Sequence, residues 1–294
     1  MEAATEHPHK TMDRQDLFQP PGAQLRAELD TLIRDMYARN AYMTSWYGTV
    51  PYSTSLTQKL KNFLSYARRG FDSQIGRNNR GKDYEPLPGA GDDDRLPWYL
   101  YWEIAHVMQF GPRLAPGMKA LDAGGTGSLF TSYLASKGVE VHSIDLNPDL
   151  VAIGNDIAQK MGFNMKSYSM DMTKIQFPAE SFDHAYSICV FEHLELQQRH
   201  RALAEIHRIL RPGGRLSITF DYRNPRPFLA TRGMCTDQEH LILTQGDIER
   251  SFLSSGHFEL EPGAPFHDNG KNYLVNSTCK DTPYTFGSVI LRKR

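Results

Sequence analysis

A glycine-rich turn after a short apolar run constrains the fold of this chain more than any other feature. Residues 120–127 read Ala-Leu-Asp-Ala-Gly-Gly-Thr-Gly and precede a helical pattern. A second apolar run, residues 139–145, follows and ends in Asp145. A strand, a glycine turn, a helix and a strand that ends in a carboxylate are typical of an open parallel sheet. The pattern therefore predicts a polar crevice where these strands end.

The regular alternation of apolar runs and helical patterns after Met118 predicts a doubly wound α/β fold. We expect strands near 118–123, 139–145, 164–170, 182–189 and 214–221, and helices near 128–137, 148–161 and 196–210. A helix near 245–255 precedes a sixth strand that starts at Phe258, and a seventh starts at Phe286. The last strands are expected to pair antiparallel at the end of a seven-stranded sheet.

The first 112 residues follow a different, mostly helical pattern. Residues 1–20 are polar and are expected to be a loose terminus. Helical spacing predicts helices at 23–40 and 55–69, and an aromatic helix at 98–110. The glycine, proline and charge between them predict a flexible loop near 70–97. We therefore divide the chain into a helical N-terminal extension, 1–112, which caps the site, and a core domain, 113–294.

The composition limits which binding partners and which cellular compartment are expected. Lysine and arginine total 33 against 34 aspartates and glutamates, so no nucleic-acid partner is expected. The sequence predicts neither a membrane span nor a secretion signal. Three widely separated cysteines predict neither a disulfide framework nor a zinc site, which favours a reducing, cytoplasmic setting.

The turn and Asp145 together indicate a site for an adenosine cofactor. Nicotinamide dinucleotides and S-adenosylmethionine both bind at such a crevice. A dinucleotide turn needs a third glycine, but Phe130 stands three residues after Gly127. Asp122 would repel a pyrophosphate, whereas it can order the turn or hold a cationic amino-acid group. These residues favour S-adenosylmethionine.

At this point the sequence resembles the class I S-adenosylmethionine-dependent methyltransferases, especially the small-molecule group that includes ubiquinone and menaquinone biosynthesis methyltransferases. The resemblance covers about Leu114 to Gly256 and rests on five blocks in the family's order: 121–127, 143–148, 169–172, 182–194 and 209–216. It implies a Rossmann-like core and S-adenosyl-L-methionine as the cofactor.

The resemblance also implies which residues bind the cofactor. Asp145 would accept hydrogen bonds from the ribose hydroxyls, and Ile188 would contribute its backbone carbonyl. Asp171 would face the adenine amino group, although aspartates also cap turns. The full expected set is Asp122, Gly124, Gly125, Gly127, Asp145, Leu146, Asp171, Met172 and Ile188.

Two departures from the family pattern affect these expectations. Thr126 and Ser128 occupy positions where the family commonly has glycine, so the turn's contacts stay open. The quinone O-methyltransferases carry a metal-linked Glu-x-x-Glu-His, but Cys189 replaces its first glutamate here. A hard cation would lose an oxygen ligand, so no metal is predicted.

Glu192 and His193, just after the fourth strand, are the candidate catalytic pair. A histidine near the transferred methyl could deprotonate a hydroxyl or amine nucleophile. The alternative is that this segment starts a helix that packs under the cofactor. Aromatic residues at 42–52 and 98–102 either pack the extension onto the core or line the acceptor cavity.

The sequence therefore predicts methyl transfer from S-adenosylmethionine to oxygen, nitrogen or carbon of a small-molecule, biosynthetic acceptor. The expected mechanism is in-line displacement that depends mostly on alignment and exclusion of water. An NAD(P)-dependent oxidoreductase and a non-catalytic S-adenosylmethionine-binding regulator are the alternatives. The acceptor and the oligomeric state stay open.

Overall fold

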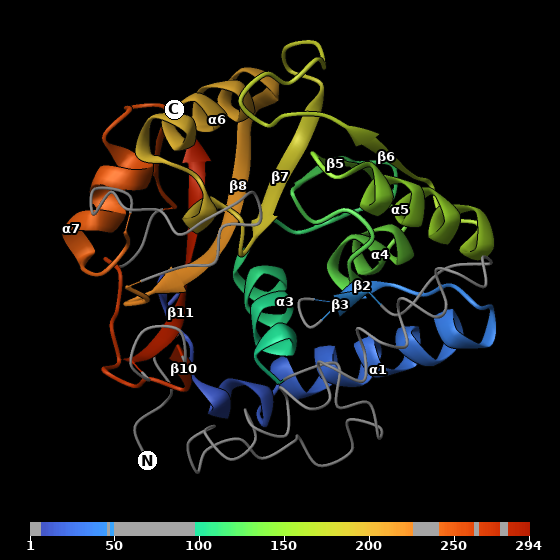
Figure 1. Ribbon diagram of the computed structural model, residues 1–294, viewed down its shortest axis with the longest axis horizontal. Helices are drawn as coiled ribbons and strands as arrows, with labels where there is room; N and C mark the ends of the chain where they lie inside the picture. The colour runs from blue at the N-terminus through green and yellow to red at the C-terminus, as the bar shows by residue number, and fades with distance from the viewer. Residues whose placement is uncertain (1–6, 46–47, 50–97, 226–240, 262–264, 277–281) are drawn as a thin grey trace.

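A mixed sheet with helices on both faces forms the centre of the computed structural model (Figure 1). The structure describes residues 7–45, 48–49, 98–225, 241–261, 265–276 and 282–294. The main path through the sheet has the strand order β1-β11-β8-β7-β4-β5-β6, and β9 and β10 also pair with β11.

The seven predicted strands are all confirmed. Five of them run parallel: β4 (Lys119–Ala123), β5 (Glu140–Asp145), β6 (Met165–Ser169), β7 (Phe182–Ile188) and β8 (Leu210–Tyr222). The predicted last two, β9 (Phe258–Leu260) and β11 (Thr282–Lys293), pair antiparallel with each other, and β11 also pairs antiparallel with β8. Two short strands that were not predicted, β1 (Lys10–Thr11) and β10 (Leu274–Asn276), complete this sheet.

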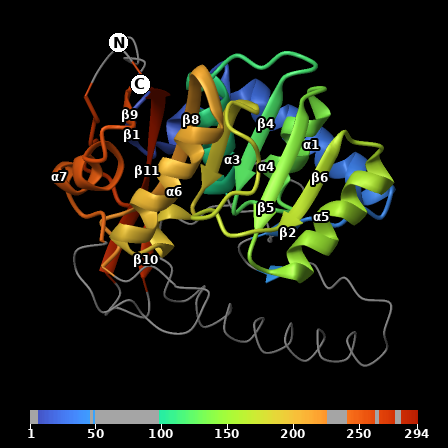
Figure 2. The same ribbon diagram turned by 90° about the horizontal axis from the view of Figure 1, so that it is seen from above.

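The predicted helices lie on opposite faces of the sheet (Figure 2). The first face carries α1 (Gly22–Ala38), α3 (Trp98–Phe110), α4 (Leu129–Ser136) and α5 (Pro148–Met161). The second face carries α6 (Leu196–Ile209), α7 (Gln245–Ile248) and the π-helical turn η4 (Glu249–Leu253). The shorter elements are the 3-10 turns η1 (Arg14–Leu17) and η2 (Phe191–His193) and the hairpin of β2 (Thr44–Ser45) and β3 (Gly48–Thr49).

Local sequence explains where the core helices begin and end. The Asn147 side chain accepts a hydrogen bond from the Asp149 N–H at the start of α5, and Pro148 fits the first turn. Gly162, with φ 67°, ends this helix in the left-handed conformation that glycine adopts readily.

The alternation of side chains along the strands divides the core into two layers. In β4, Ala120 packs in the layer under α3 and α4, whereas Leu121 packs in the layer under α6. Large aromatic side chains fill both layers, for example Phe130 in the first and Phe252 in the second. Burial of each such side chain stabilises the fold by about 1.5–3 kcal/mol. The packed sheet therefore gives the loops at its strand ends a firm base.

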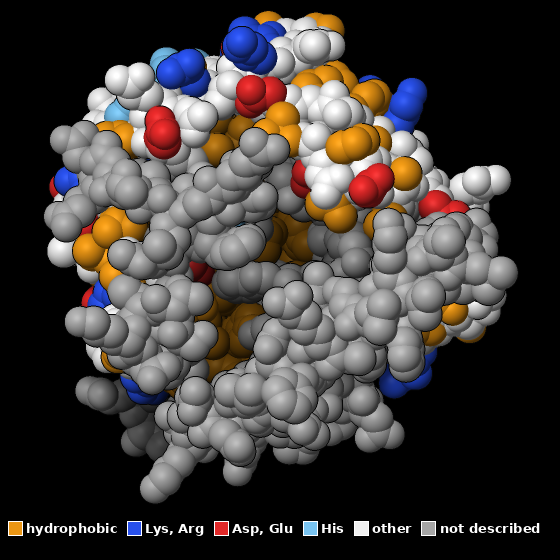
Figure 3. Space-filling view, in the orientation of Figure 1, with side chains coloured by type: hydrophobic (Ala, Val, Ile, Leu, Met, Phe, Trp, Pro, Cys, Tyr) orange, Lys and Arg blue, Asp and Glu red, His pale blue; other side chains and the backbone are white. Residues whose placement is uncertain are grey.

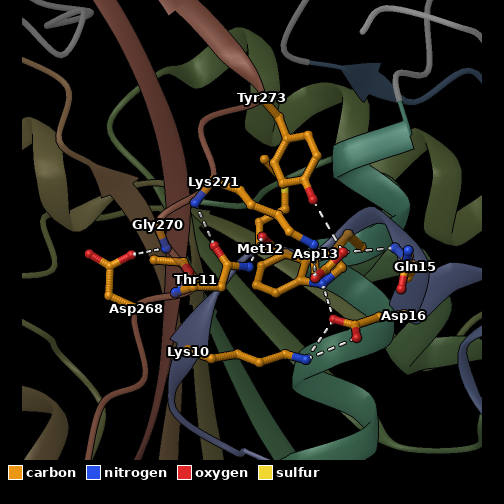
Figure 4. A network of polar contacts seen from close by, with 12 residues as sticks. Lys10, Thr11, Met12, Asp13, Gln15, Asp16, Asp268, Gly270, Lys271 and Tyr273 are labelled. Atoms are coloured by element: carbon orange, nitrogen blue, oxygen red, sulfur yellow. Dashed lines mark hydrogen bonds and ion pairs between the residues drawn. The ribbon is translucent and has the colours of Figure 1, made fainter. Parts of the chain in front are cut away.

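The N-terminal segment is ordered from residue 7 to residue 17, so the expected loose terminus is wrong there. Lys10–Thr11 pairs with β11, and Met12 and Leu17 are fully buried. Figure 4 shows Asp13 accepting hydrogen bonds from Lys271 and Tyr273, at 2.7 and 3.1 Å. Polar residues in this segment find partners far away in sequence, which local composition does not reveal.

Part of the predicted N-terminal extension is not among the described residues. The helix near 55–69 and the loop near 70–97 lie outside the described residues. The division at residue 112 stays a prediction, although β1 lies in the same sheet as the core strands. Within the described part of the chain, every helix is too short or too polar to cross a membrane.

Candidate functional site

The site lies where the sheet changes its direction of winding. β4 is flanked by β5, which follows it in the chain, and by β7, which comes after β6. Asp122 of β4 stands opposite Ser143 on one side and Tyr186 on the other. Loops that leave neighbouring strands in opposite directions open a crevice at their carboxyl ends, and ligands of open α/β sheets bind there. Near the middle of Figure 3, hydrophobic side chains of described residues are visible between those that are not described.

The turn after β4 needs glycine because other groups approach its backbone closely. A Cβ atom on Gly125 would lie 2.3 Å from Oδ2 of Asp122. One on Gly124, whose φ is +89°, would lie 2.6 Å from a methyl carbon of Val190 in the loop after β7. The turn therefore packs directly on the Asp122 carboxylate and on the β7 exit.

Asp122 is fully buried beneath this turn. Its Oδ2 accepts a 2.5 Å hydrogen bond from the Thr131 hydroxyl, whereas its Oδ1 has no partner among the described residues. Burial, with a smaller contribution from the nearby Asp145 carboxyl, outweighs the Thr131 hydrogen bond and raises the pKa of Asp122 to about 7. A cationic group beside Oδ1 would favour the charged carboxylate.

Thr126 and Ser128, the departures from the family pattern, have structural roles. The Ser128 side chain accepts a 3.2 Å hydrogen bond from the Thr131 N–H and so caps α4. Thr126 is buried, and its methyl carbon would lie 3.0 Å from a Cβ added to Gly154 of α5. Both side chains hold the turn between α4 and α5.

Asp145 and Leu146 lie at the end of β5, on the opposite side of the turn from β7. Oδ1 of Asp145 accepts a 2.8 Å hydrogen bond from the Asn147 N–H, and burial raises the pKa of this carboxyl. Leu146 is 64% exposed, whereas most large hydrophobic side chains among the described residues are buried. A carboxylate beside an exposed apolar surface can bind a ribose and one face of an adenine.

The remaining expected cofactor residues end the next strands. The Met170 N–H after β6 donates to the Asp145 carbonyl at 3.0 Å, so Asp171 lies close to the end of β5. Oδ1 of Asp171 accepts a 2.8 Å hydrogen bond from the Thr173 N–H, which is the turn-capping role considered above. Met172 is buried, and Ile188 is the last residue of β7.

A second polar group, which we call the acid cluster, consists of Glu103, Cys189, Glu192 and Asp221. The Cys189 thiol and the Thr219 hydroxyl donate to Oε1 of Glu103, at 2.7 and 2.6 Å. The Cys189 sulfur and carboxylate oxygens of Glu192 and Asp221 lie within 4.8 Å of one another. Residues from α3, the β7 exit and the end of β8 therefore meet beside the crevice.

Burial and mutual repulsion keep protons on the acid cluster. Burial raises the pKa of Glu103 and the pKa of Asp221 to about 7 each. Burial, and then the Asp221 and Glu103 carboxyls, raise the pKa of Glu192 well above its ordinary value. Several like charges cannot ionise together in a buried site without a cation.

The expected catalytic pair is adjacent but is not hydrogen-bonded. Nε2 of His193 lies 3.9 Å from Oε1 of Glu192, which is too long for a hydrogen bond. Burial, and then Arg199, lower the pKa of His193 to about 4. His193 is therefore neutral at pH 7 and is a weak proton acceptor there, while the Glu192 carboxylate points into the acid cluster.

Sequence reasoning missed Glu103 and Asp221, although each has a local signal. Glu103 is the only Asp, Glu, Lys or Arg within Trp98–Phe110, and it is 2% exposed. Asp221 is the last but one residue of β8, close to the carboxyl end of the strand, as Asp145 is at the end of β5. Acidic residues placed in such apolar surroundings are candidates for function because their burial is costly.

The aromatic residues of α3 support packing more than a role in a cavity. Trp98, Tyr99, Tyr101 and Trp102 are all at most 3% exposed. Tyr101 donates to Asp30 of α1 at 2.7 Å, and Trp102 donates to Asp16 of η1 at 2.8 Å. The expected aromatic residues at 46–47 and 52 lie outside the described residues.

Comparisons with known proteins agree with this arrangement. Residues 121–218 match the family described as "Methyltransferase domain". The ubiquinone/menaquinone biosynthesis C-methyltransferase UbiE of Rhizobium etli (strain CFN 42) is 33% identical over 122 residues, which are 40% of this chain and 46% of that protein. The protein of the same name from Bordetella parapertussis is 34% identical over 115 residues, 38% of this chain and 44% of that protein.

The chain thus spans less than half the length of these curated relatives. Among solved structures, the [4+2]-cyclase SpnF superposes with a TM-score of 0.51 and 18% sequence identity, covering 69% of this chain and 85% of that chain. A likeness at this level of identity shows the fold and does not define the reaction.

Proposed function

We propose, from the premise that residues 121–218 are a methyltransferase domain whose cofactor is S-adenosylmethionine, that this protein transfers a methyl group to a small-molecule acceptor. One observation carries the proposal. The glycine turn over Asp122 and the carboxylate of Asp145 flank the point where the sheet reverses its winding. The same positions serve cofactor binding in the family that the sequence resembles.

Two features of the turn support the fit of this cofactor. The unpartnered Oδ1 of Asp122 is buried beside the turn, where it favours a cationic amino-acid group over a pyrophosphate. Gly125 lets the backbone of the turn lie against the Asp122 carboxylate, because a Cβ there would stand 2.3 Å from Oδ2. We assign Asp145 to the ribose hydroxyls, Leu146 to the adenine face, and the Ile188 carbonyl to the amino-acid end.

When bound, S-adenosylmethionine supplies a methyl group that a nucleophile of the acceptor displaces from sulfur. The chain contributes alignment and the exclusion of water, because the site is built from buried strand ends. If the nucleophile must lose a proton, His193 is a weak acceptor because its pKa is lowered to about 4, and Glu192, whose pKa is raised well above its ordinary value, can accept a proton only when it is ionised. His193 then lines the site in its neutral form.

The alternatives differ in which ligand they require. A dinucleotide would need a third glycine near Phe130, which is instead buried against Tyr186 with ring centroids 5.1 Å apart. A regulator that binds S-adenosylmethionine without turnover shares every cofactor contact, so only an assay separates it from an enzyme.

Calorimetry and a turnover assay together test the proposal. The chain should bind S-adenosylhomocysteine in preference to NADH or NADPH by at least about tenfold. Methyl transfer to a metabolite panel is then followed as formation of S-adenosylhomocysteine. Preference for a nicotinamide cofactor would support the oxidoreductase, and tight binding without turnover across the panel would support the regulator.

A further inference from the structure

Glu192 is a buried carboxyl group that accepts no well-formed hydrogen bond from the described residues. Its side chain is 2% exposed, and neither Oε1 nor Oε2 has a partner among the described residues. Oδ1 of Asp221, in the same acid cluster, also has none, while its Oδ2 accepts a 2.6 Å hydrogen bond from Asn224. Leaving such groups unpaired in a buried site is costly, so this arrangement is suited to a ligand that donates hydrogen bonds.

The unpartnered atoms define the chemistry of that ligand. When Glu192 and Asp221 ionise beside a cation, three unpartnered oxygens, two on Glu192 and one on Asp221, can act as acceptors in one buried group. A primary ammonium group carries a positive charge and three N–H donors, which matches three acceptors. The Cys189 thiol donates to Glu103 and therefore keeps its proton, whereas a metal would require the thiolate.

The acid cluster also adjoins the cofactor turn. Val190, next to Cys189 in the chain, packs against Gly124 so closely that a Cβ there would lie 2.6 Å away. Cys189 adopts a φ of 50°, and its N–H donates to the Thr219 hydroxyl at 3.1 Å. A left-handed conformation is unfavourable for a cysteine and is often retained at functional sites. This conformation at Cys189 turns the chain after β7 so that it passes between the glycine turn and β8.

We propose that the acid cluster binds a primary ammonium group of the methyl acceptor, with Glu192 and Asp221 accepting its three N–H donors. This inference rests on the proposed function, since it describes the acceptor of the same site. It narrows the substrate class to small molecules that carry a primary amine. Oε1 of Glu103 already accepts hydrogen bonds from Cys189 and Thr219, so Glu103 supports the cluster rather than supplying one of the three acceptors.

Matched probes test the inference by binding, without any need for turnover. The full chain is titrated with benzylamine, methylamine, benzyl alcohol and benzyltrimethylammonium, with and without S-adenosylhomocysteine, by calorimetry or ligand-observed NMR. Benzylamine should bind at least about tenfold more tightly than the alcohol or the trimethylammonium compound. Glu192→Gln should weaken benzylamine binding about tenfold or more, whereas the same change at the exposed Glu249 should leave it within about twofold.

Each other result overturns the inference. Recognition of three N–H donors would be contradicted if neither primary amine bound better than benzyl alcohol. It would also be contradicted if benzyltrimethylammonium bound as tightly as benzylamine. Unchanged benzylamine binding in Glu192→Gln would contradict the assigned site, with Asp221→Asn as the second variant should the first not fold. Tight binding of Zn²⁺ or Mn²⁺ alone that requires Glu192 would replace the amine by a metal. Absence of S-adenosylhomocysteine binding would count against the proposed function, while amine preference is read independently of it.

Discussion

The two acidic regions at the carboxyl edge of the sheet differ in how far the protein satisfies them by itself. Beside the glycine turn, Asp122 accepts a hydrogen bond from Thr131, and Asp145 accepts one from the Asn147 N–H. In the acid cluster, Glu192 accepts none from the described residues. Among the described residues, the first region has one buried carboxylate oxygen without a partner, Oδ1 of Asp122, whereas the second has three, on Glu192 and Asp221.

This difference separates binding that depends on backbone shape from binding that depends on charge. The cofactor region relies on close approach, because Gly125 lies against a carboxylate that Thr131 holds in place. The acid cluster relies on a balance between burial and ionisation, because Glu103 and Asp221 both have pKa values raised to about 7. Changes in shape should therefore damage the first region most, and changes in charge the second.

Gly125→Ala should have the largest effect. The new Cβ would lie 2.3 Å from Oδ2 of Asp122, so the turn or the carboxylate must shift. We expect the free energy of unfolding to fall by about 2–4 kcal/mol. The affinity for S-adenosylhomocysteine should fall about tenfold or more. In the control, Gly246→Ala, the new Cβ meets only Thr244 Oγ1 at 3.7 Å. Equal behaviour of the two variants would contradict a turn that depends on close approach.

Asp145→Asn should affect the cofactor and leave the fold intact. The amide keeps the size of the side chain but cannot accept two hydroxyl hydrogen bonds as a charged group does. We expect S-adenosylhomocysteine affinity to fall about 10- to 100-fold, with little change in melting temperature. Asp149→Asn, at an exposed position in the first turn of α5, is the matched control. If both variants bind alike, Asp145 is not the ribose carboxylate.

Asp221→Asn, a change in the acid cluster, should alter how the stability of the protein depends on pH. The pKa of Asp221 is about 7 in the folded chain and lies above its ordinary value of 3.8, so its favourable contribution is lost as pH rises through 7. The variant removes this loss. Its melting temperature relative to wild type should therefore increase by ~3–6 °C between pH 5 and pH 7.5.

The quantity to measure is the difference in melting temperature between wild type and Asp221→Asn. The melting temperature of either protein alone also reflects the buried His106, whose effect on stability has the opposite pH dependence. Its pKa is lowered to about 3, so its neutral form favours folding more as pH rises toward 6.5. That contribution cancels in the comparison of wild type with variant. A difference in melting temperature that does not change with pH would mean that Asp221 is already ionised at pH 5 in the folded protein.

The same contrast explains which parts of the molecule could be predicted from sequence. The seven core strands and the glycine turn are specified by residues close together in the chain, so period and spacing suffice. The acid cluster joins Glu103 to residues 86 and 116 positions later, at Cys189 and Thr219. The ordered N-terminal segment likewise depends on Asp13 meeting Lys271, 258 residues away. Pairings at such distances follow from the complete fold.

Ser128→Ala should have the smallest effect and would sharpen the division between shape and charge. Ser128 stands where the family commonly has glycine, yet its hydroxyl oxygen caps α4 by accepting from the Thr131 N–H. Loss of the cap should cost about 1 kcal/mol of stability, measured by chemical denaturation. The Ser128 hydroxyl also contacts the Thr131 hydroxyl at 2.9 Å, but in the variant Thr131 can still donate to Asp122. S-adenosylhomocysteine affinity should therefore stay within about twofold. A larger loss of affinity would place Ser128 in contact with the cofactor, and the turn would then bind it through side chains as well as through its backbone.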